Sequence, residues 1–326
     1  MSLARFVARR SGEIVITLFI IATLTFIVLR LMPSDPAGML LDPYSTPEMK
    51  RLQRELWGLD RSYAEQYIIF LKNLIRGEFG VSFFTQKDVY DIIKERLPAT
   101  VLLFTTMTVL SFSWGVHAGR VIAWRRGGKL EYGSTIIGML LYSMPVFWLC
   151  LMAVWIFSFK LGLFPLGGMK TPELWDAAAS TSLLVKALDI GHHLFLPLTV
   201  GSVLFFPGVM LMMRNVMVET YGEDYILTAR AKGLSEGDVR DRHASRNVML
   251  PVVTDFMLTL AYSFSGSMIL ESVFSWPGLG AEFLEAAATY DYPVAQGAFI
   301  IMGAVLLVAI LVADILYGYL DPRIRY

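Results

Sequence analysis

Six long apolar runs constrain the fold of this chain more than any other feature of its sequence. A helix needs about 20 residues to cross the hydrocarbon core of a bilayer. The candidate spans are 14–29, which is slightly short, 97–119, 133–159, 194–213, 248–270 and 292–313. Helices hydrogen-bond all of their own backbone groups in lipid, and these runs are far longer than the strands of a membrane β-barrel. The sequence therefore predicts an all-α membrane protein with six transmembrane helices.

Composition agrees with this class. Hydrophobic residues make up 55% of the chain and charged residues only 17%, whereas charged residues make up about one-quarter of soluble domains. The formal net charge of zero gives no support for nucleic-acid binding. The first span follows Arg5, Arg9 and Arg10, as in a secretory signal peptide, but no small-residue cleavage site follows it. We therefore predict an uncleaved signal-anchor helix.

Lys and Arg residues predict the orientation, because they gather in short cytoplasmic loops. Six spans place four basic segments on one side of the membrane. These residues are Arg5, Arg9 and Arg10; Arg125, Arg126 and Lys129; Arg214, Arg230, Lys232, Arg240, Arg242 and Arg246; and Arg323 and Arg325. The outer loop 275–291 has none. Both termini are thus expected in the cytoplasm.

We expect three parts along the chain. Residues 1–32 hold the N-terminal end and the first span, 33–96 form an extracytoplasmic helical cap, and 97–326 form the core with five spans. In the cap, Thr46 and Pro47 predict a helix start, and apolar spacing predicts amphipathic helices over 63–75 and 89–97. In the outer loop 160–193, an amphipathic piece is expected over 172–190. The turn at 276–280 precedes a run, 283–288, that is too short to span and is expected as a re-entrant or surface helix.

The segment 214–251 is polar and basic, yet it lies between two predicted spans. Helix is favoured over 219–232, and Gly233 is a natural stop because glycine adopts left-handed dihedrals at little cost. Ser235 and Asp238 then resemble a capping box with aspartate in place of glutamate. A second helix is expected to end near Asn247, before Pro251. The alternative is a solvated basic loop that only obeys the positive-inside rule.

The residues of this segment carry a family resemblance. Thr228-Ala-Arg-Ala-Lys-Gly-Leu234, followed by Arg242-His-Ala-Ser-Arg-Asn247 and Leu250-Pro251, resembles the EAA-type cytoplasmic motif of ABC importer permeases. The form is similar to that of the dipeptide/oligopeptide permease family, first-permease type. Similar stretches in the same order cover nearly the whole chain: Met32–Pro36, Gly77–Ser82, Arg96–Thr100, Phe164–Gly167, Glu271–Gly280, Asp291–Val294 and Leu320–Arg325. Leu227-Thr228 replaces the Glu-Ala that names the motif, and the spacing from Gly233 to Pro251 is longer than in the general motif.

The resemblance implies a prokaryotic cell-membrane permease that contains no catalytic site, metal or cofactor. ATP and Mg²⁺ would bind separate ATPase subunits, since the chain has no phosphate-binding loop. The expected partners are a second homologous permease, two ATP-binding subunits, an extracytoplasmic substrate-binding protein and the lipid bilayer. The residues expected to couple to the ATPase are Thr228, Ala229, Arg230, Ala231, Lys232, Gly233 and Leu234. The residues expected to support that loop are Ser235, Asp238, Arg242, His243, Asn247 and Pro251.

The implied substrate is a peptide-like solute, with an oligosaccharide or a metal chelate as alternatives. Asp255, inside the fifth span, is either a pathway or subunit contact or a satisfied acid near the cytoplasmic end. His192 and His193 are adjacent, so their side chains point apart on a helix and suit a single metal poorly. A membrane hydrolase would need a Ser/His or paired-acid site, and a secondary carrier would need inverted repeats; neither pattern is found in the sequence.

Overall fold

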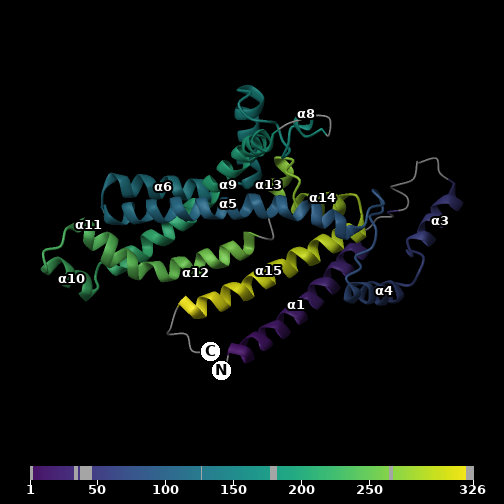
Figure 1. The fold of residues 1–326 in the computed structure, drawn as a ribbon, viewed down its shortest axis with the longest axis horizontal. Helices are drawn as coiled ribbons and strands as arrows, with labels where there is room; N and C mark the ends of the chain where they lie inside the picture. Colours follow the sequence, from purple (N-terminus) through teal and green to yellow (C-terminus); the bar gives the residue numbers. More distant parts are fainter. Residues whose placement is uncertain are drawn as a thin grey trace. The chain divides into compact units, whose positions relative to one another are not determined.

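The computed structural model describes residues 3–32, 36, 46–125, 127–176, 182–263 and 267–320, without the side chains of 3, 4, 246, 247, 250, 263 and 316–320. Within these ranges the named elements are all helices, and the only β-pairing is an isolated bridge between Val81 and Asp88. In chain order the helices are α1 (Leu3–Leu31), α3 (Pro47–Leu56), α4 (Tyr63–Arg76), α5 (Val89–Trp124), α6 (Lys129–Ser143), α7 (Val146–Ala153), the π-helical η1 (Val154–Lys160), α8 (Pro172–Trp175), α9 (Leu183–Thr220), α10 (Asp224–Ala231), α11 (Glu236–Asp238), the π-helical η2 (Val239–Ala244), α12 (Ser245–Ser263), α13 (Met268–Val273), α14 (Leu279–Ala288) and α15 (Tyr292–Leu320) (Figure 1). The all-α prediction is confirmed.

Four of the described helices are long and apolar enough to cross a membrane. They are α1, α5, α9 and α15. The bent pair made by α6 and α7–η1 gives a fifth if it is counted as one span. Four predicted spans, 14–29, 97–119, 194–213 and 292–313, therefore lie within single helices. The total of six spans stays a prediction.

The third predicted span, 133–159, is not one straight helix. It breaks after Ser143, and the two halves are bent by 96°. Met144 has an extended backbone, with φ −72° and ψ 137°, and Pro145 follows it as the N-cap of α7. A residue before proline is pushed out of the helical region by the proline ring, which accounts for a break that the apolar run alone does not reveal.

The fourth and fifth spans also differ from the prediction. α9 begins at Leu183 and continues for 38 residues, so no separate amphipathic helix covers 172–190; α8 takes only its first four residues, and 177–181 lie outside the described residues. The fifth span is divided between α12 and α13, with 264–266 outside the described residues. The uninterrupted apolar part of α12, Pro251–Tyr262, is shorter than a span.

The predicted helix starts within 33–96 are confirmed. Thr46 caps α3 by accepting a hydrogen bond from the Met49 backbone N–H. Ser62 and Glu65 form a reciprocal capping box at the start of α4, which ends at Gly77 with φ +76°. The short helix after the turn at 276–280 is α14. The predicted helix over 89–97 is the first part of α5, which continues through Pro98.

The chain forms two compact units that interleave along the sequence. Unit 1 comprises Met1–Thr100, Ser265–Ser272 and Pro277–Val308, and unit 2 comprises Val101–Phe264, Val273–Trp276 and Ala309–Tyr326. Each unit has its own apolar core. The division into 1–32, 33–96 and 97–326 stays a prediction.

In unit 1, the fully buried Glu271 stabilises the turn before α14. The Glu271 carboxylate accepts hydrogen bonds from the Thr100 hydroxyl at 2.7 Å and from the Ala281 backbone N–H at 2.8 Å. Thr100 in turn accepts the Leu279 N–H at 2.8 Å. A Cβ added to Gly278 would collide with this carboxylate. Glycine is therefore required where the backbone of the turn closes around Glu271.

A second buried acid in unit 1 has the same character. Asp291 accepts from the Ser82 hydroxyl at 2.5 Å and from the Phe83 N–H at 3.1 Å, which ties the turn after α4 to the start of α15. The Phe83 ring stacks on Trp57, with centroids 4.1 Å apart. Both acids thus act as acceptors for groups that are distant in the sequence.

In unit 2, two glycines of α5 let the backbone of α9 approach. A Cβ on Gly115 would lie 2.6 Å from the Cβ of Val209, and one on Gly119 would lie 2.5 Å from the Met210 carbonyl oxygen. Small residues four apart on a membrane helix permit such close contact. α9 also packs against α6, where buried Glu131 accepts hydrogen bonds from Arg214 and from the Gly127 N–H. α9 is therefore held by two neighbouring helices.

We predict that Gly119→Ala lowers the free energy of unfolding by about 1–3 kcal/mol, because overpacking must separate two backbones. Gly133→Ala is the matched control, since nothing lies within 4 Å of a Cβ at that helical position. It should be neutral or stabilising by about 0.5–1 kcal/mol, because alanine is the better helix former. Thermal unfolding of the purified protein in detergent measures both. Equal midpoints for the two variants would contradict the close α5–α9 contact.

Glu271→Gln is expected to lower the free energy of unfolding by about 1–3 kcal/mol, because the amide turns a donor toward groups that themselves donate. The control is Glu285→Gln on the exposed side of α14, which should stay within about 0.5 kcal/mol of the wild type. The same thermal scan reports both. A Glu271→Gln protein as stable as the control would show that the carboxylate does not fasten the turn.

Candidate functional site

The predicted pair of helices within 214–251 is present, but both helices have different limits. α9 runs on to Thr220, the chain turns at Tyr221 and Gly222, and α10 begins at Asp224. The prediction of one helix over 219–232 is therefore wrong at its start. The second helix does not end near Asn247. It continues from α11 through η2 into α12 and contains Pro251, since a proline is tolerated in a membrane helix when neighbouring groups satisfy the freed carbonyl.

The turn between α10 and α11 is built as the sequence indicates. Gly233 has φ +77°, a conformation that side chains other than glycine adopt at a cost. Its N–H donates to the Arg230 carbonyl at 2.9 Å, and the Lys232 N–H donates to the Thr228 carbonyl at 3.1 Å. The last turn of α10 is thus closed by its own backbone.

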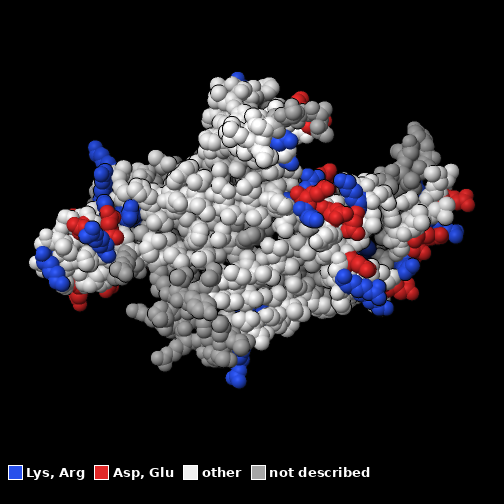
Figure 2. Space-filling view, viewed as in Figure 1, with Lys and Arg blue, Asp and Glu red and all other residues white. Residues whose placement is uncertain are grey.

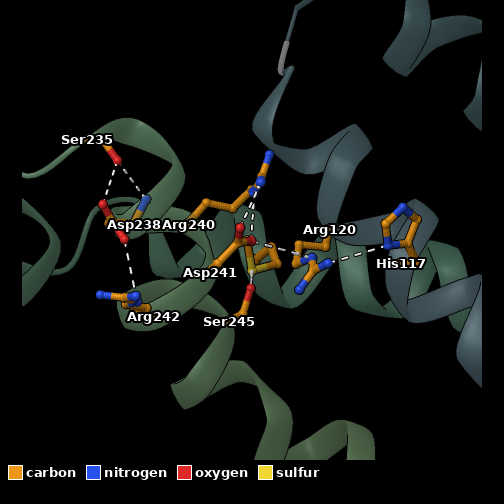
Figure 3. A network of polar contacts seen from close by, with 9 residues as sticks. His117, Arg120, Ser235, Asp238, Arg240, Asp241, Arg242 and Ser245 are labelled. Carbon is orange, nitrogen blue, oxygen red and sulfur yellow. Dashed lines mark hydrogen bonds and ion pairs between the residues drawn. The ribbon is translucent and has the colours of Figure 1, made fainter.

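Ser235 caps α11, although the capping box is only partly formed. The Asp238 N–H donates to the Ser235 hydroxyl at 3.2 Å, which is the expected forward bond. The Asp238 carboxylate accepts from the same hydroxyl at 2.7 Å and pairs with Arg242 at 3.4 Å (Figure 3). Aspartate is one methylene shorter than the glutamate of a full capping box, which explains why it bonds the hydroxyl.

One side of α10 is buried against the chain itself. Ile226 is fully buried and Ala229 is 3% exposed. They belong to one apolar cluster with residues of α9 and of the helix that follows: Met213, Met217, Val239, Ala244, Val248 and Val252. The sequence predicts an apolar side of this helix that contains Tyr225, Ile226, Leu227 and Ala229, but Tyr225 and Leu227 are exposed. Ala229 therefore packs within this chain, and its expected coupling to an ATPase stays a prediction.

The opposite side of the turn is open. We call the exposed residues Thr228, Arg230, Ala231, Lys232, Gly233, Leu234 and Ser235 the tip surface. Leu234 is 39% exposed there. Within unit 2, charged atoms gather where α10 and α11 lie, beside helices whose visible surface is almost uncharged (Figure 2). The tip surface is thus a polar projection with an exposed leucine.

Ion pairs stabilise η2, which follows the tip surface in the chain. The Asp241 carboxylate accepts two hydrogen bonds from Arg240, both 2.8 Å, and lies 3.6 Å from Nε of Arg120 on α5 (Figure 3). The hydrogen bonds from Arg240, and then the nearby charges of Arg120 and His117, lower the pKa of Asp241 below its ordinary value. The carboxylate is therefore ionised at neutral pH and links η2 to α5.

Arg230 forms a further ion pair within the tip surface. Its guanidinium pairs with Glu236 across the glycine turn, with Nε and Oε1 3.1 Å apart, and lies 5.8 Å from the Trp124 ring centroid. The sequence interpretation did not include Arg120, Asp241, Trp124 or Glu236. A charged residue at the end of a predicted span, such as Arg120, was the one available signal for this network.

The remaining residues that the sequence singles out lie in η2, α12 and α9. Arg242 is exposed, His243 is partly buried, and Pro251 is exposed within α12; the Asn247 side chain lies outside the described ones. Asp255 is partly buried on α12, and its role stays a prediction. Far along α9, His192 contacts the Leu163 carbonyl and His193 the Asp189 carbonyl. No metal-binding group of three or more His, Cys, Asp or Glu occurs among the described residues.

Comparison with known proteins identifies the family. The family model described as "Binding-protein-dependent transport system inner membrane component" matches residues 115–326, and its N-terminal counterpart matches residues 3–104. The di/tripeptide transport system permease protein DppB of Pseudomonas aeruginosa is 34% identical, over 98% of each chain. The oligopeptide transport system permease protein AppB of Bacillus subtilis is also 34% identical, over 99% of this chain and 100% of its own.

A third relative, the dipeptide transport system permease protein DppB of Escherichia coli, is 32% identical over 99% of each chain. Full-length similarity at this level agrees with the two family models, which together cover nearly the whole sequence. The apolar helices and these relatives make the chain a multi-pass inner membrane protein. It belongs to the family of inner membrane permease components of binding-protein-dependent transport systems.

Proposed function

We propose that this chain is a permease subunit of an ATP-driven peptide importer and that its tip surface receives the movement of a separate ATPase subunit. One observation carries the proposal. Ile226 and Ala229 anchor α10 in the core of unit 2, while the residues from Ala231 to Leu234 stay exposed. A projection that is buried on one side and open on the other is suited to transmit force from a partner into α9 and α12.

Mechanical coupling requires that the projection move as one body. The apolar cluster joins α10 to α9 and α12, and the Asp241–Arg120 contact joins the same projection to α5. α11, η2 and α12 follow one another without a loop, so a displacement of the tip surface reaches the membrane along one helix. Nucleotide and Mg²⁺ belong on the partner subunit in this proposal, and the chain itself holds no cofactor.

The proposed assembly contains two homologous permease chains, two ATP-binding subunits and an extracytoplasmic binding protein that delivers the solute. With the predicted six spans and the basic loops on the cytoplasmic side, the proposed orientation has the N- and C-termini and the tip surface in the cytoplasm of a prokaryotic cell. The names of the relatives favour di-, tri- or oligopeptides as substrates. An oligosaccharide or metal chelate handled by the same machinery is the alternative, and a stand-alone secondary carrier is less well supported.

The exposed and buried alanines of α10 give a direct test. We expect Ala231→Trp to reduce co-purification of the ATPase subunits at least tenfold and to abolish ATP-dependent tripeptide uptake, because the indole blocks an exposed contact. Its thermal unfolding should match that of the wild type. Ala229→Leu should instead lower the free energy of unfolding by about 1–3 kcal/mol, because that site is already filled.

Ala64→Trp is the matched control, because Ala64 is an exposed alanine on α4 in unit 1. This variant should keep full ATPase association and uptake. Normal uptake by Ala231→Trp, or uptake by the wild-type chain without any ATPase subunit, would contradict the proposed coupling. If the complex took up an oligosaccharide and no peptide, the proposed coupling would stand and the proposed peptide substrate would be wrong.

The glycine turn supplies a second test. Gly233→Ala forces a side chain into a left-handed conformation, at a cost of about 1–2 kcal/mol, and should displace Leu234 from its place on the tip surface. We expect ATP hydrolysis to continue while uptake per ATP falls severalfold. Gly237→Ala is the control, since its φ is not positive and it lies in a helix. Equal uptake per ATP in the two variants would argue against a role for the turn.

A further inference from the structure

A cavity of about 320 Å³ lies within unit 1 and shares no lining residue with the tip surface. It is formed where the last turn of α1 meets the α3–α4 turn and the first turns of α15. This volume falls at the lower end of the range for small-molecule sites. Neither the sequence interpretation nor the proposed coupling gives the cavity a role.

A partly buried arginine with a buried Nη1 atom lines this cavity. The Arg30 guanidinium lies 5.2 Å from the Phe26 ring centroid and 4.3 Å from that of Tyr292, and its Nε donates to Oε1 of Gln66 at 2.7 Å. Among the residues that the structure describes, no carboxylate pairs with Arg30, and its buried Nη1 has no hydrogen-bond acceptor. A buried positive charge is costly when it is uncompensated, so the site calls for an anion.

The arginine is held in place by a side chain that is itself fixed. Gln66 is 8% exposed, and its Nε2 donates to the Arg61 carbonyl at 2.9 Å and, more weakly, to the Leu59 carbonyl at 3.4 Å. This leaves Oε1 of Gln66 directed at Arg30. The two aromatic rings and the amide therefore orient the guanidinium, and Nη1 remains as the uncommitted donor.

A second uncommitted donor lines the same cavity. Gln296, on the second turn of α15, is only 7% exposed, and its Nε2 has no acceptor among the described residues. Leaving a buried donor unsatisfied costs about 1–3 kcal/mol. The N-terminus of α15 adds partial positive charge at this position. Arg30 and Gln296 thus present buried N–H groups to the cavity, and neither group has an acceptor in the described part of the chain.

The other charged groups that line the cavity limit the charge of a ligand. They are Arg61, Glu55 and Glu78; Glu55 already pairs with Arg51 at 3.0 Å. Two arginines and two glutamates leave no large positive field, so di- and trivalent anions are disfavoured. We propose that this cavity binds the carboxylate of a small monocarboxylate solute, with Arg30 and Gln296 donating to its oxygens.

Isothermal titration of the full-length chain in lipid nanodiscs tests the proposal. The probes are N-acetylalanine and N-acetylphenylalanine, each paired with its uncharged C-terminal amide of the same shape. Each pair isolates the carboxylate. At least one acid should bind saturably and at least tenfold more tightly than its amide, and inorganic phosphate should not compete. Because no ATPase or transport is involved, failure here is distinguishable from failure of the proposed coupling.

Two variants test whether Arg30 and Gln296 donate the hydrogen bonds to the bound carboxylate. Arg30→Met and Gln296→Leu should each weaken binding of the acid at least tenfold, whereas Lys72→Met, an exposed cation on α4 outside the cavity lining, should not. Gln296→Leu should unfold at the same temperature as the wild type or higher, because it removes an unsatisfied buried donor. A structural role for Gln296 would lower that temperature.

The proposal fails if neither acid binds saturably, if acid and amide bind equally, if phosphate is preferred, or if Gln296→Leu keeps wild-type affinity. Should Arg30→Met not fold, Gln296→Leu alone decides the outcome, since its stability is measured in the same preparation.

Discussion

The lack of water in the bilayer core is the constraint on which the rest of this structure depends. Every backbone N–H and C=O placed there must be hydrogen-bonded within the protein, so the chain folds as helices. Departures from helix then need specific compensation. The turn before α14 closes around the Glu271 carboxylate, which accepts the Thr100 hydroxyl and the Ala281 N–H. Irregular backbone occurs where such acceptors are provided.

Packing within unit 2 explains why the tip surface is able to act as a rigid projection. α10 is only eight residues long and would be marginal as an isolated helix. Burial of Ile226 and Ala229 against α9 and α12 replaces the stability that its length does not supply. The Arg230–Glu236 pair is exposed and contributes little by itself, but it spans the glycine turn and limits its motion. Packing therefore holds the projection, and the ion pairs set its orientation.

The sequence predicted those features that depend on local chemistry. Thr46 and Gly233 each have one physical role at a helix end, and each occupies it. The sequence did not predict which face of α10 is buried, because Ala229 and Ala231 differ only in what packs against them. The break at Met144 was missed because apolar content does not report the restriction that Pro145 imposes. Partners distant in the sequence, such as Thr100 with Glu271, leave no periodic signal.

The buried polar groups fall into two kinds, and the difference between them bears on function. Glu131, Asp189, Glu271 and Asp291 are each surrounded by donors from the same chain. Asp189, for example, accepts from the Thr171 N–H and hydroxyl and from the Trp175 indole. Arg30 and Gln296 differ from these acids. Gln66 fixes the orientation of Arg30, and Gln296 is buried, yet each has a donor nitrogen without an acceptor among the described residues. The fold provides donors for these four buried acids, whereas within the described residues it provides no carboxylate for the partly buried Arg30. An open donor beside a cavity is therefore better understood as a binding feature than as a packing defect.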